Sequence, residues 1–394
     1  MRITAIRATP VNIPLEVPFF WSVGTYPGTT KVIVEVMTDE GLVGLGEAPS
    51  LSCTSIITDL LTPKLIGTDA FDIKACERLC VPETKIDSNT ADTSALRAFG
   101  AIEMALWDLR GKAWQQPLYK LLGGTVRKEI PFTEYFAFRQ EKGGVGGEST
   151  PVEVATYCAR MRDLHGSTFF EGKCPPGDPR TTVDVVRKIR EAVGDDALLR
   201  LDANMGFSLT SARYMLSEIE QWNIDNFEDP VATFYDMAKL RQHSFIPFST
   251  HVPDLKLAVR LGVPDNFVLN LASLGGISRT CNFIAACEEM GFGLWFYSGD
   301  AGIASAAYLH VAAATQHIHQ PSQSLFRWQT DDVIEEGPFR PKNNVLAVPD
   351  GPGLGVTLSP SALKRCHERF RQEGPYDHYH DPSHPGWYAR IPIG

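Results

Sequence analysis

The strongest constraint on the fold is a regular alternation of short apolar segments and amphipathic segments between residues 129 and 316. The apolar segments are typical of strands, and the amphipathic segments are typical of helices. The predicted strands are 167–173, 197–204, 224–229, 246–251, 266–271 and 293–297. Strands that recur every 25 residues or so, with helices between them, indicate parallel βαβ units. About seven such units in a row favour a closed α/β barrel over an open doubly wound sheet.

The segment before the barrel has a different character. Residues 1–46 alternate between apolar and polar side chains, which predicts antiparallel strands with a turn at Asp39-Glu40-Gly41. Helical periodicity follows over 55–79 and 95–114. The first predicted domain is therefore α+β and covers residues 1–125, and the barrel covers 126–345. Regularity fades after about residue 329, and residues 346–394 form a third, C-terminal segment.

One segment of the first domain is rich in both aromatic residues and turn formers. Residues 17–28 carry Phe19, Phe20, Trp21 and Tyr26 among glycines and prolines. We expect a loop here, either folded as a plug or mobile as a flap over a pocket.

Charge and cysteine usage narrow the function classes. The chain has 37 Lys and Arg against 47 Asp and Glu, a net charge of −10, which argues against nucleic acid or an anionic membrane as partner. No apolar run is long enough to span a membrane, and Met1-Arg2-Ile3-Thr4 begins a strand-like segment without a signal-peptide core. The 8 cysteines form no CxxC pair and are expected to be reduced and buried. We therefore predict a cytoplasmic protein. The sequence contains no phosphate loop, nucleophile elbow or dinucleotide fingerprint.

Chemistry-bearing residues follow the predicted barrel strands. Asp202, Glu228 and His251 end three successive strands, so a barrel would direct them to one point. Two converging carboxylates repel each other unless a cation joins them, and hard oxygen ligands suit Mg²⁺. His251 is a third candidate ligand, or a hydrogen-bond partner of a substrate. Asp254 is the alternative third ligand, although it is better placed as a helix cap.

Lys173 ends another strand, directly before Cys174-Pro175-Pro176-Gly177. A partly desolvated lysine near a bound cation is suited to act as a general base. The alternative is a solvated lysine that points out of the barrel mouth. Three histidines, His378, His380 and His384, are expected to belong to a surface tail rather than a metal site.

At this point the sequence resembles the enolase superfamily, in the mandelate racemase and muconate lactonizing branch, over nearly its whole length. The matching motifs lie at residues 100–112, 121–124, 201–204, 227–230, 274–277 and 351–356. The resemblance implies a modified TIM barrel, (β/α)₇β, under an N-terminal α+β capping domain. It also implies two flaps, Val17–Thr30 and Pro49–Ile56, that close over the barrel, and a C-terminal segment that returns to the cap.

The resemblance further implies the chemistry. Members bind Mg²⁺, which holds a substrate carboxylate while a base removes the α-proton, and the resulting enediolate is stabilised by the metal. The partner is thus a small-molecule carboxylate, and family habit suggests a homo-oligomer. The expected metal ligands are Asp202, Glu228 and His251, and the expected base is Lys173. Candidate substrate-binding residues are Trp21, Tyr26, Glu171, Asn204, Asn270 and Phe296.

Departures from the family pattern limit the reaction. The family's usual Lys-x-Lys reads Glu171-Gly172-Lys173, and His251 stands where a third carboxylate is usual. Asn270 and Ser273 stand where other members carry an aspartate or a second lysine, and no histidine lies in 291–309. Both usual second bases are absent. Tyr297 and Asp300 are the titratable groups left at the last strand, and either could act as an acid.

With Lys173 as the one assured base, a two-base racemisation is disfavoured. We predict dehydration of a hydroxylated carboxylic acid, a hydro-lyase reaction, because residues 331–335 and 337–339 resemble those of acid-sugar dehydratases. Cycloisomerisation is the alternative, since the aromatic flap hints at a less polar substrate. A catalytically silent carboxylate-binding relic also stays open.

Overall fold

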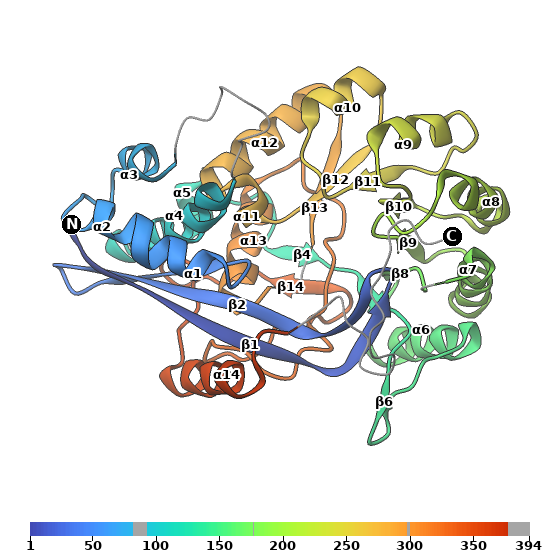
Figure 1. Cartoon of the computed structure of the whole chain (residues 1–394), viewed down its shortest axis with the longest axis horizontal. Coiled ribbons are helices and arrows are strands. Elements are labelled where there is room, and N and C mark those ends of the chain that lie inside the picture. Colours follow the sequence, from blue (N-terminus) through green and yellow to red (C-terminus); the bar gives the residue numbers. More distant parts are fainter. Residues whose placement is uncertain (82–92, 176, 298–299, 377–394) are drawn as a thin grey trace.

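The computed structural model describes residues 1–81, 93–175, 177–297 and 300–376. The first domain contains an antiparallel sheet in the order β1-β2-β3, formed by β1 (Ile3–Trp21), β2 (Gly24–Thr38) and β3 (Val43–Ala48). β1 and β2 form a long ribbon that extends across the barrel (Figure 1). The predicted antiparallel strands are thus confirmed.

The loop expected at residues 17–28 is wrong, because the two strands continue through it to a tight hairpin. Trp21 pairs with Gly24, and Phe19 pairs with Tyr26 beyond a register shift that follows Pro14. The rings of Phe19 and Tyr26 are stacked with centroids 4.9 Å apart. Cross-strand aromatic pairs stabilise a ribbon, so the aromatic residues here favour strand rather than loop.

Helices cover one face of this sheet. They are α1 (Cys53–Ser55), the π-helix η1 (Ile56–Leu61), α2 (Thr62–Leu65), α3 (Ile73–Cys80), α4 (Ser94–Ala113) and α5 (Leu118–Leu121). The long α4 was predicted almost to the residue, whereas the segment predicted over 55–79 is broken at residues 66–72. α4 lies directly on β3 at Gly46, where a Cβ atom would come 1.9 Å from the carbonyl oxygen of Ala101. Only glycine permits this approach.

The second domain is a curved parallel sheet in the order β13-β12-β11-β10-β9-β8-β5. Its strands are β5 (Glu134–Phe136), β8 (Phe169–Lys173), β9 (Leu198–Asp202), β10 (Asn226–Glu228), β11 (Phe248–Thr250), β12 (Asn266–Leu269) and β13 (Gly293–Phe296). All six predicted strands are present. An irregular segment bridges the two edges: Gln323 N donates to Phe296 O at 2.8 Å, and Thr133 N donates to Ser322 O at 2.8 Å. This bridge connects the edge strands β13 and β5, as the predicted (β/α)₇β architecture requires.

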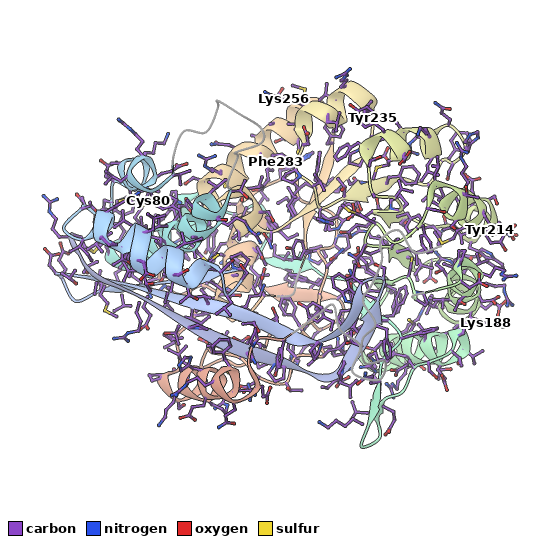
Figure 2. The ribbon with its side chains drawn as sticks, in the orientation of Figure 1. Cys80, Lys188, Tyr214, Tyr235, Lys256 and Phe283 are labelled. Carbon is purple, nitrogen blue, oxygen red and sulfur yellow. The ribbon has the colours of Figure 1, made fainter. Side chains whose placement is uncertain are left out.

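Helices surround this sheet on its outer side (Figure 1). They are α6 (Pro151–His165), α7 (Pro179–Val193), α8 (Leu209–Ile219) with the 3₁₀ turn η2 (Glu220–Trp222), α9 (Phe234–Arg241), α10 (Leu255–Leu261), α11 (Leu271–Leu274), α12 (Ile277–Met290) and α13 (Gly302–Ala314). α6 begins with a capping box, in which Thr150 N donates to Glu153 Oε2 at 2.9 Å and Glu153 N donates to Thr150 Oγ1 at 3.3 Å. Side chains on the outer helix faces, such as Tyr214 and Tyr235, are exposed (Figure 2).

Shorter elements complete the chain. β4 (Glu129–Pro131) pairs with β14 (Val345–Ala347), and β6 (Glu141–Lys142) pairs with β7 (Val145–Gly146). The last described helix, α14 (Pro360–Glu373), returns to the capping sheet, where Arg369 Nη1 donates to Asn12 O of β1 at 3.0 Å. In the described part of the chain, no helix is both long enough and apolar enough to cross a membrane. The eight cysteines are free thiols, and seven of them are buried.

Candidate active site

A cavity of about 500 Å³ lies between the capping ribbon and the carboxyl ends of the barrel strands. Residues from both domains line it. The capping domain contributes Phe19, Trp21, Tyr26, Lys31 and Arg97, and the barrel contributes Tyr135, Lys173, Asp202, Asn204, Glu228, His251, Tyr297 and Gln323. Buried concave sites at the carboxyl ends of barrel strands are where catalysis takes place in this class of fold.

Two carboxylates form the centre of the site. Asp202 and Glu228 are the last residues of β9 and β10 and are paired in register, so their side chains leave the sheet on the same side. They are only 2% and 3% exposed. Burial raises the pKa of Glu228 well above its usual range, and the negative charges of Asp202, Asp229 and Glu171 raise it further. The charged form of Glu228 is therefore disfavoured, and a divalent cation bound between the two carboxylates would favour it.

Lys173 is the last residue of β8 and is paired in register with Asp202. Its ammonium group forms a buried ion pair with the Asp202 carboxylate. Nζ also lies 5.5 Å from the ring centre of Trp21 and 5.9 Å from that of Tyr135. Burial lowers the pKa of Lys173, but Asp202 and the other acidic groups outweigh it and raise the pKa well above its usual value. The alternative interpretation, a solvated lysine that points out of the barrel mouth, is wrong, because Lys173 is buried and lines the cavity.

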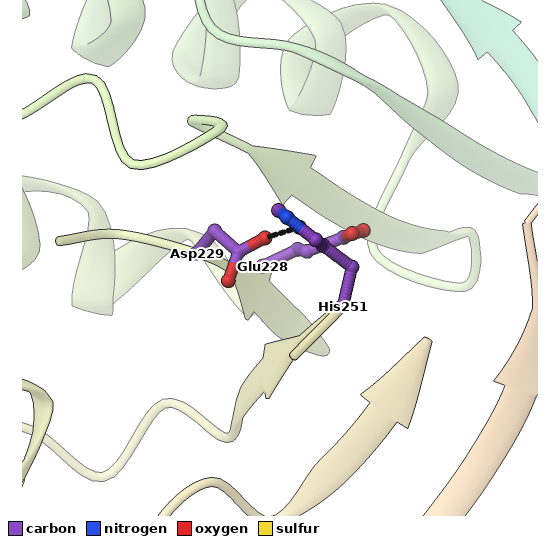
Figure 3. A group of neighbouring side chains, drawn as sticks. All are labelled: Glu228, Asp229 and His251. Carbon is purple, nitrogen blue, oxygen red and sulfur yellow. Dashed lines mark hydrogen bonds and ion pairs between the residues drawn. The ribbon is translucent and has the colours of Figure 1, made fainter. Parts of the chain in front are cut away.

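A further acidic residue lies beside the predicted ligands. Glu228, Asp229 and His251 each offer one ligand atom, and these atoms lie within 4.8 Å of one another (Figure 3). Asp229 is buried and in the left-handed region, at φ 42°. Its carboxylate accepts a hydrogen bond from Thr250 Oγ1 at 2.6 Å and bonds to His251 Nδ1. The sequence placed Asp229 at a strand end but assigned it no role.

The bond to Asp229 determines what His251 can do. Burial lowers the pKa of His251, but Asp229 outweighs it and raises the pKa above its usual value. Nδ1 is occupied, so Nε2 is the nitrogen that could meet a metal ion or a substrate. Asp254, the alternative ligand, accepts from Leu257 N at 3.0 Å as the N-cap of α10. Its prediction as a helix cap is confirmed.

Glu171 lies below this centre, inside the barrel. It is fully buried, 3.7 Å from Arg200 Nη1, and accepts from Gln323 Nε2 at 2.9 Å. Gln323 also donates to the Glu228 carboxylate and so connects the two acids. Gln323 lines the described part of the cavity wall, whereas Glu171 does not. Gln323 lies in an irregular segment, and no sequence pattern pointed to it.

The other predicted site residues fall into two groups. Trp21, Tyr26, Asn204 and Tyr297 line the cavity. Asn204, in the left-handed region at φ 46°, donates from Nδ2 to Asp202 Oδ2 at 3.1 Å and from its backbone N to Asp202 Oδ1 at 2.7 Å. It thereby fixes the orientation of the Asp202 carboxylate.

Asn270, Phe296 and Asp300 do not belong to the described part of the cavity wall. Asn270 caps α11 by accepting from Ser273 N at 2.7 Å, and it donates to the Tyr297 hydroxyl. Phe296 faces the core, where its ring stacks on Tyr308 at 5.1 Å. The Asp300 carboxylate lies behind Lys31, with which it forms a buried ion pair.

His378, His380 and His384 of the tail lie outside the described residues. Pro176, near Lys173, and Ser298, next to Tyr297, also lie outside them. Lys31 and Arg97 were missed from the sequence because they belong to the capping domain. Neither lies at the end of a barrel strand, where the sequence pattern predicts site residues. Only the three-dimensional arrangement brings them to the cavity.

Comparisons with known proteins agree with this architecture. Residues 3–123 match the family "Mandelate racemase / muconate lactonizing enzyme, N-terminal domain", and residues 153–362 match "Enolase C-terminal domain-like". The chain therefore belongs to the enolase superfamily, in the mandelate racemase and muconate lactonizing branch.

The similar proteins carry out different reactions. A probable glucarate dehydratase of Streptomyces coelicolor is 27% identical over 94% of this chain and 92% of its own length. The chloromuconate cycloisomerase CbnB of Cupriavidus necator is 29% identical over 91% of this chain and 97% of its own. A crystal structure of an enolase from Thermobispora bispora complexed with magnesium and formate superposes with a TM-score of 0.87 at 26% identity, covering 96% of each chain. The superfamily is thus shown, whereas the relatives divide between lyases and isomerases.

Proposed function

We propose that this chain is a Mg²⁺-dependent enzyme that removes the α-proton of a carboxylate substrate, with Lys173 as the base. One observation carries the proposal: Lys173, Asp202 and Glu228 end three adjacent parallel strands and line one cavity. Burial of a lysine next to two acids costs folding stability, so the arrangement favours a functional role over a structural one.

The donor set fits a magnesium ion. Asp202 and Glu228 offer buried carboxylate oxygens, and burial followed by the neighbouring negative charges raises the pKa of Glu228, an effect that a bound cation would oppose. Together with His251 through Nε2, these residues would hold the ion. Bound there, it would stabilise the negative charge that a substrate carboxylate gains when its α-proton leaves. The similar structure from Thermobispora bispora, which contains magnesium, supports this choice of metal.

The surroundings of Lys173 suit proton abstraction. Trp21 and Tyr135 lie beside its amine and exclude bulk water from it. Asp202 holds the amine at the mouth of the strands, and Asn204 in turn fixes Asp202. A substrate carboxylate bound near Asp202 and Glu228 would therefore present its α-carbon to a positioned amine.

We favour dehydration of a hydroxylated carboxylic acid as the reaction. The match to a probable glucarate dehydratase over most of both chains supports it. Cycloisomerisation is the second candidate, supported by the apolar side of the cavity, where Phe19, Trp21 and Tyr26 form the wall. Both reactions begin with the same proton transfer at carbon.

The test is exchange of the α-proton with solvent. Purified protein would be incubated in deuterated water with Mg²⁺ and D-glucarate, D-gluconate, L-tartrate or muconolactone, and the α-proton signal would be followed by NMR. We expect exchange with at least one acid, loss of exchange in Lys173→Met, and loss on chelation of the metal. Absence of exchange with every acid would support a carboxylate-binding protein without catalysis.

A further inference from the structure

A second cluster of titratable groups adjoins the cavity on the capping side. Lys31 of β2 lines the cavity, and its ammonium group is paired with the Asp300 carboxylate behind it. The side chains of Lys31 and Asp300 are only 8% and 5% exposed. Tyr308 of α13 donates its hydroxyl hydrogen to the other Asp300 oxygen. Asp300 is thereby held on both oxygens and directs the Lys31 amine.

Glu47, another acidic neighbour of Lys31, forms hydrogen bonds with backbone groups instead. Glu47 of β3 accepts from Ala301 N at 2.7 Å and from Ala304 N at 3.0 Å, at the first turn of α13. Burial, followed by the charge of Asp300, raises the pKa of Glu47 to about 8. The groups that act on the charge of Lys31 are Asp300, Tyr26, Glu47 and Tyr297. Burial lowers the pKa of Lys31, but these groups outweigh it and raise the pKa above its usual value, so the amine carries a proton.

Lys31 and Lys173 reach the cavity from different sides. Tyr297 and Asp300 follow β13, whereas Lys173 ends β8, and on the side of Asp202 and Glu228 four strands lie between β13 and β8. Asp202 and Glu228 end two of the strands in between. Tyr26 lines the same cavity as Lys31 and Lys173. A substrate held at the two carboxylates would therefore lie between the two lysines.

We propose that Lys31 is the second catalytic residue of this site, the acid that protonates the hydroxyl group leaving the β-carbon of a hydroxylated carboxylate substrate. This inference rests on the dehydration proposed above and supplies the acid that the sequence did not identify. Asp300 acts as a positioning residue through Lys31. Tyr297 and Asp300, the acids considered from the sequence, are then neighbours of the acid rather than the acid itself.

The proton and electron transfers balance with these two lysines. Lys173 first releases its ammonium proton to solvent and then takes the α-proton as a neutral amine, and the electron pair of the broken C–H bond forms the double bond between the α- and β-carbons. The β-carbon–oxygen bond breaks, its electron pair stays with the oxygen, and a proton from the Lys31 ammonium group makes the leaving group water. An α-hydroxyl substrate gives an enol that tautomerises to a 2-keto acid. Each lysine regains its starting protonation state by exchange with water.

The alternative is that Lys173 itself returns the proton to the leaving group. Two variants of Lys31 separate these mechanisms. Lys31→Met removes the acid. Lys31→Arg keeps the charge that faces Asp300, but a guanidinium does not release its proton at neutral pH. Lys173→Met is the matched control for loss of the base.

Two readouts are followed with D-glucarate, D-gluconate and L-tartrate: deuterium incorporation at the α-carbon, and 2-keto acid trapped by semicarbazide. We expect both Lys31 variants to form keto acid at least about 100-fold more slowly than the wild type, while α-proton exchange stays within about threefold. Lys173→Met should lose both activities. Circular dichroism confirms the fold of each variant, and Lys31→Arg decides the question if Lys31→Met does not fold.

Keto-acid formation at the wild-type rate in Lys31→Arg would overturn the role of Lys31 as an acid. Equal loss of exchange and elimination in both Lys31 variants would also overturn it, because it would indicate a structural role. The proposed function would survive either result. If the wild-type protein exchanges no α-proton, both proposals fail, and if it exchanges protons without forming keto acid, dehydration and the role of Lys31 fail together.

Discussion

Gln323 and Glu228 are joined by a hydrogen bond inside the barrel, although one lies in an irregular segment and the other ends a central strand. The same amide of Gln323 donates to Glu171 at 2.9 Å. One neutral side chain thus separates two buried carboxylates and satisfies an oxygen of each. The closure of the barrel and the electrostatics of the site depend on the same residue.

Replacement of this amide should therefore destabilise the protein. In Gln323→Leu both Glu171 and Glu228 lose a hydrogen-bond donor. We expect the free energy of unfolding to fall by about 1–3 kcal/mol, the usual cost of a buried polar group left without its partner. Urea denaturation of the metal-free protein measures this. Thr330→Ala, which removes a 3.3 Å hydrogen bond in the same segment at an exposed position, is the control. An unchanged midpoint for Gln323→Leu would contradict the argument.

Magnesium should stabilise the folded chain through Glu228. At a concentration 100 times the dissociation constant, a ligand that binds only the native state adds about 2.7 kcal/mol. We expect the melting temperature to rise with Mg²⁺ in the wild type and in Asp254→Asn, whose site is a helix cap. The rise should disappear in Glu228→Gln. Stabilisation that persists in Glu228→Gln would place the ion elsewhere.

Glu47 should make stability depend on pH. Its pKa is raised to about 8 in the folded chain, whereas an unfolded glutamate titrates near 4.3. The native state therefore binds the extra proton between these values, and the stability from this group, fully present below about 4.3, is lost as the pH rises through 8. Glu47→Gln should remove this decline. Urea unfolding at pH 5 and pH 8 for both proteins measures it, and parallel changes in the two proteins would contradict the assignment.

Trp21 should contribute to substrate binding more than to folding. It lies at the tip of the β1–β2 ribbon and lines the cavity, and its ring centre is 5.5 Å from Lys173 Nζ. In Trp21→Leu we expect a KM about tenfold higher for whichever acid shows α-proton exchange, with the melting temperature nearly unchanged. Trp114→Leu, at a position that is 55% exposed, is the control. A fall in kcat at constant KM would show that Trp21 acts on the reaction step itself.

The barrel and its strand-end residues could be predicted from the sequence because their periodicity is local. Lys173, Asp202 and Glu228 were found since each ends a short apolar segment, and a barrel brings such ends together. The same criterion failed for Lys31, which lies within a strand of another domain. It also failed for Phe296, whose side chain turns to the core one residue before the cavity is reached.

The aromatic ribbon tip shows a second limit. Glycine and proline at residues 17–28 predicted a loop, but the stacking of Phe19 on Tyr26 depends on the partner strand, which local propensity does not include. Asp229 and His251 illustrate the same point at the site. Each was visible at a strand end, but which atoms of the two residues bond to each other follows from side-chain geometry alone.

Because the β1–β2 ribbon forms one wall of the cavity, the cavity lies between two layers of the fold that belong to different domains. Under the proposed function, the barrel would hold the groups that act on the substrate's carboxylate and α-carbon, and the ribbon would hold groups that meet the rest of the substrate. If this proposal holds, substitutions along the ribbon would change which acids are accepted without disturbing proton abstraction. Conversely, displacement of the ribbon from the barrel would stop the proposed reaction while leaving Lys173, Asp202 and Glu228 at their strand ends.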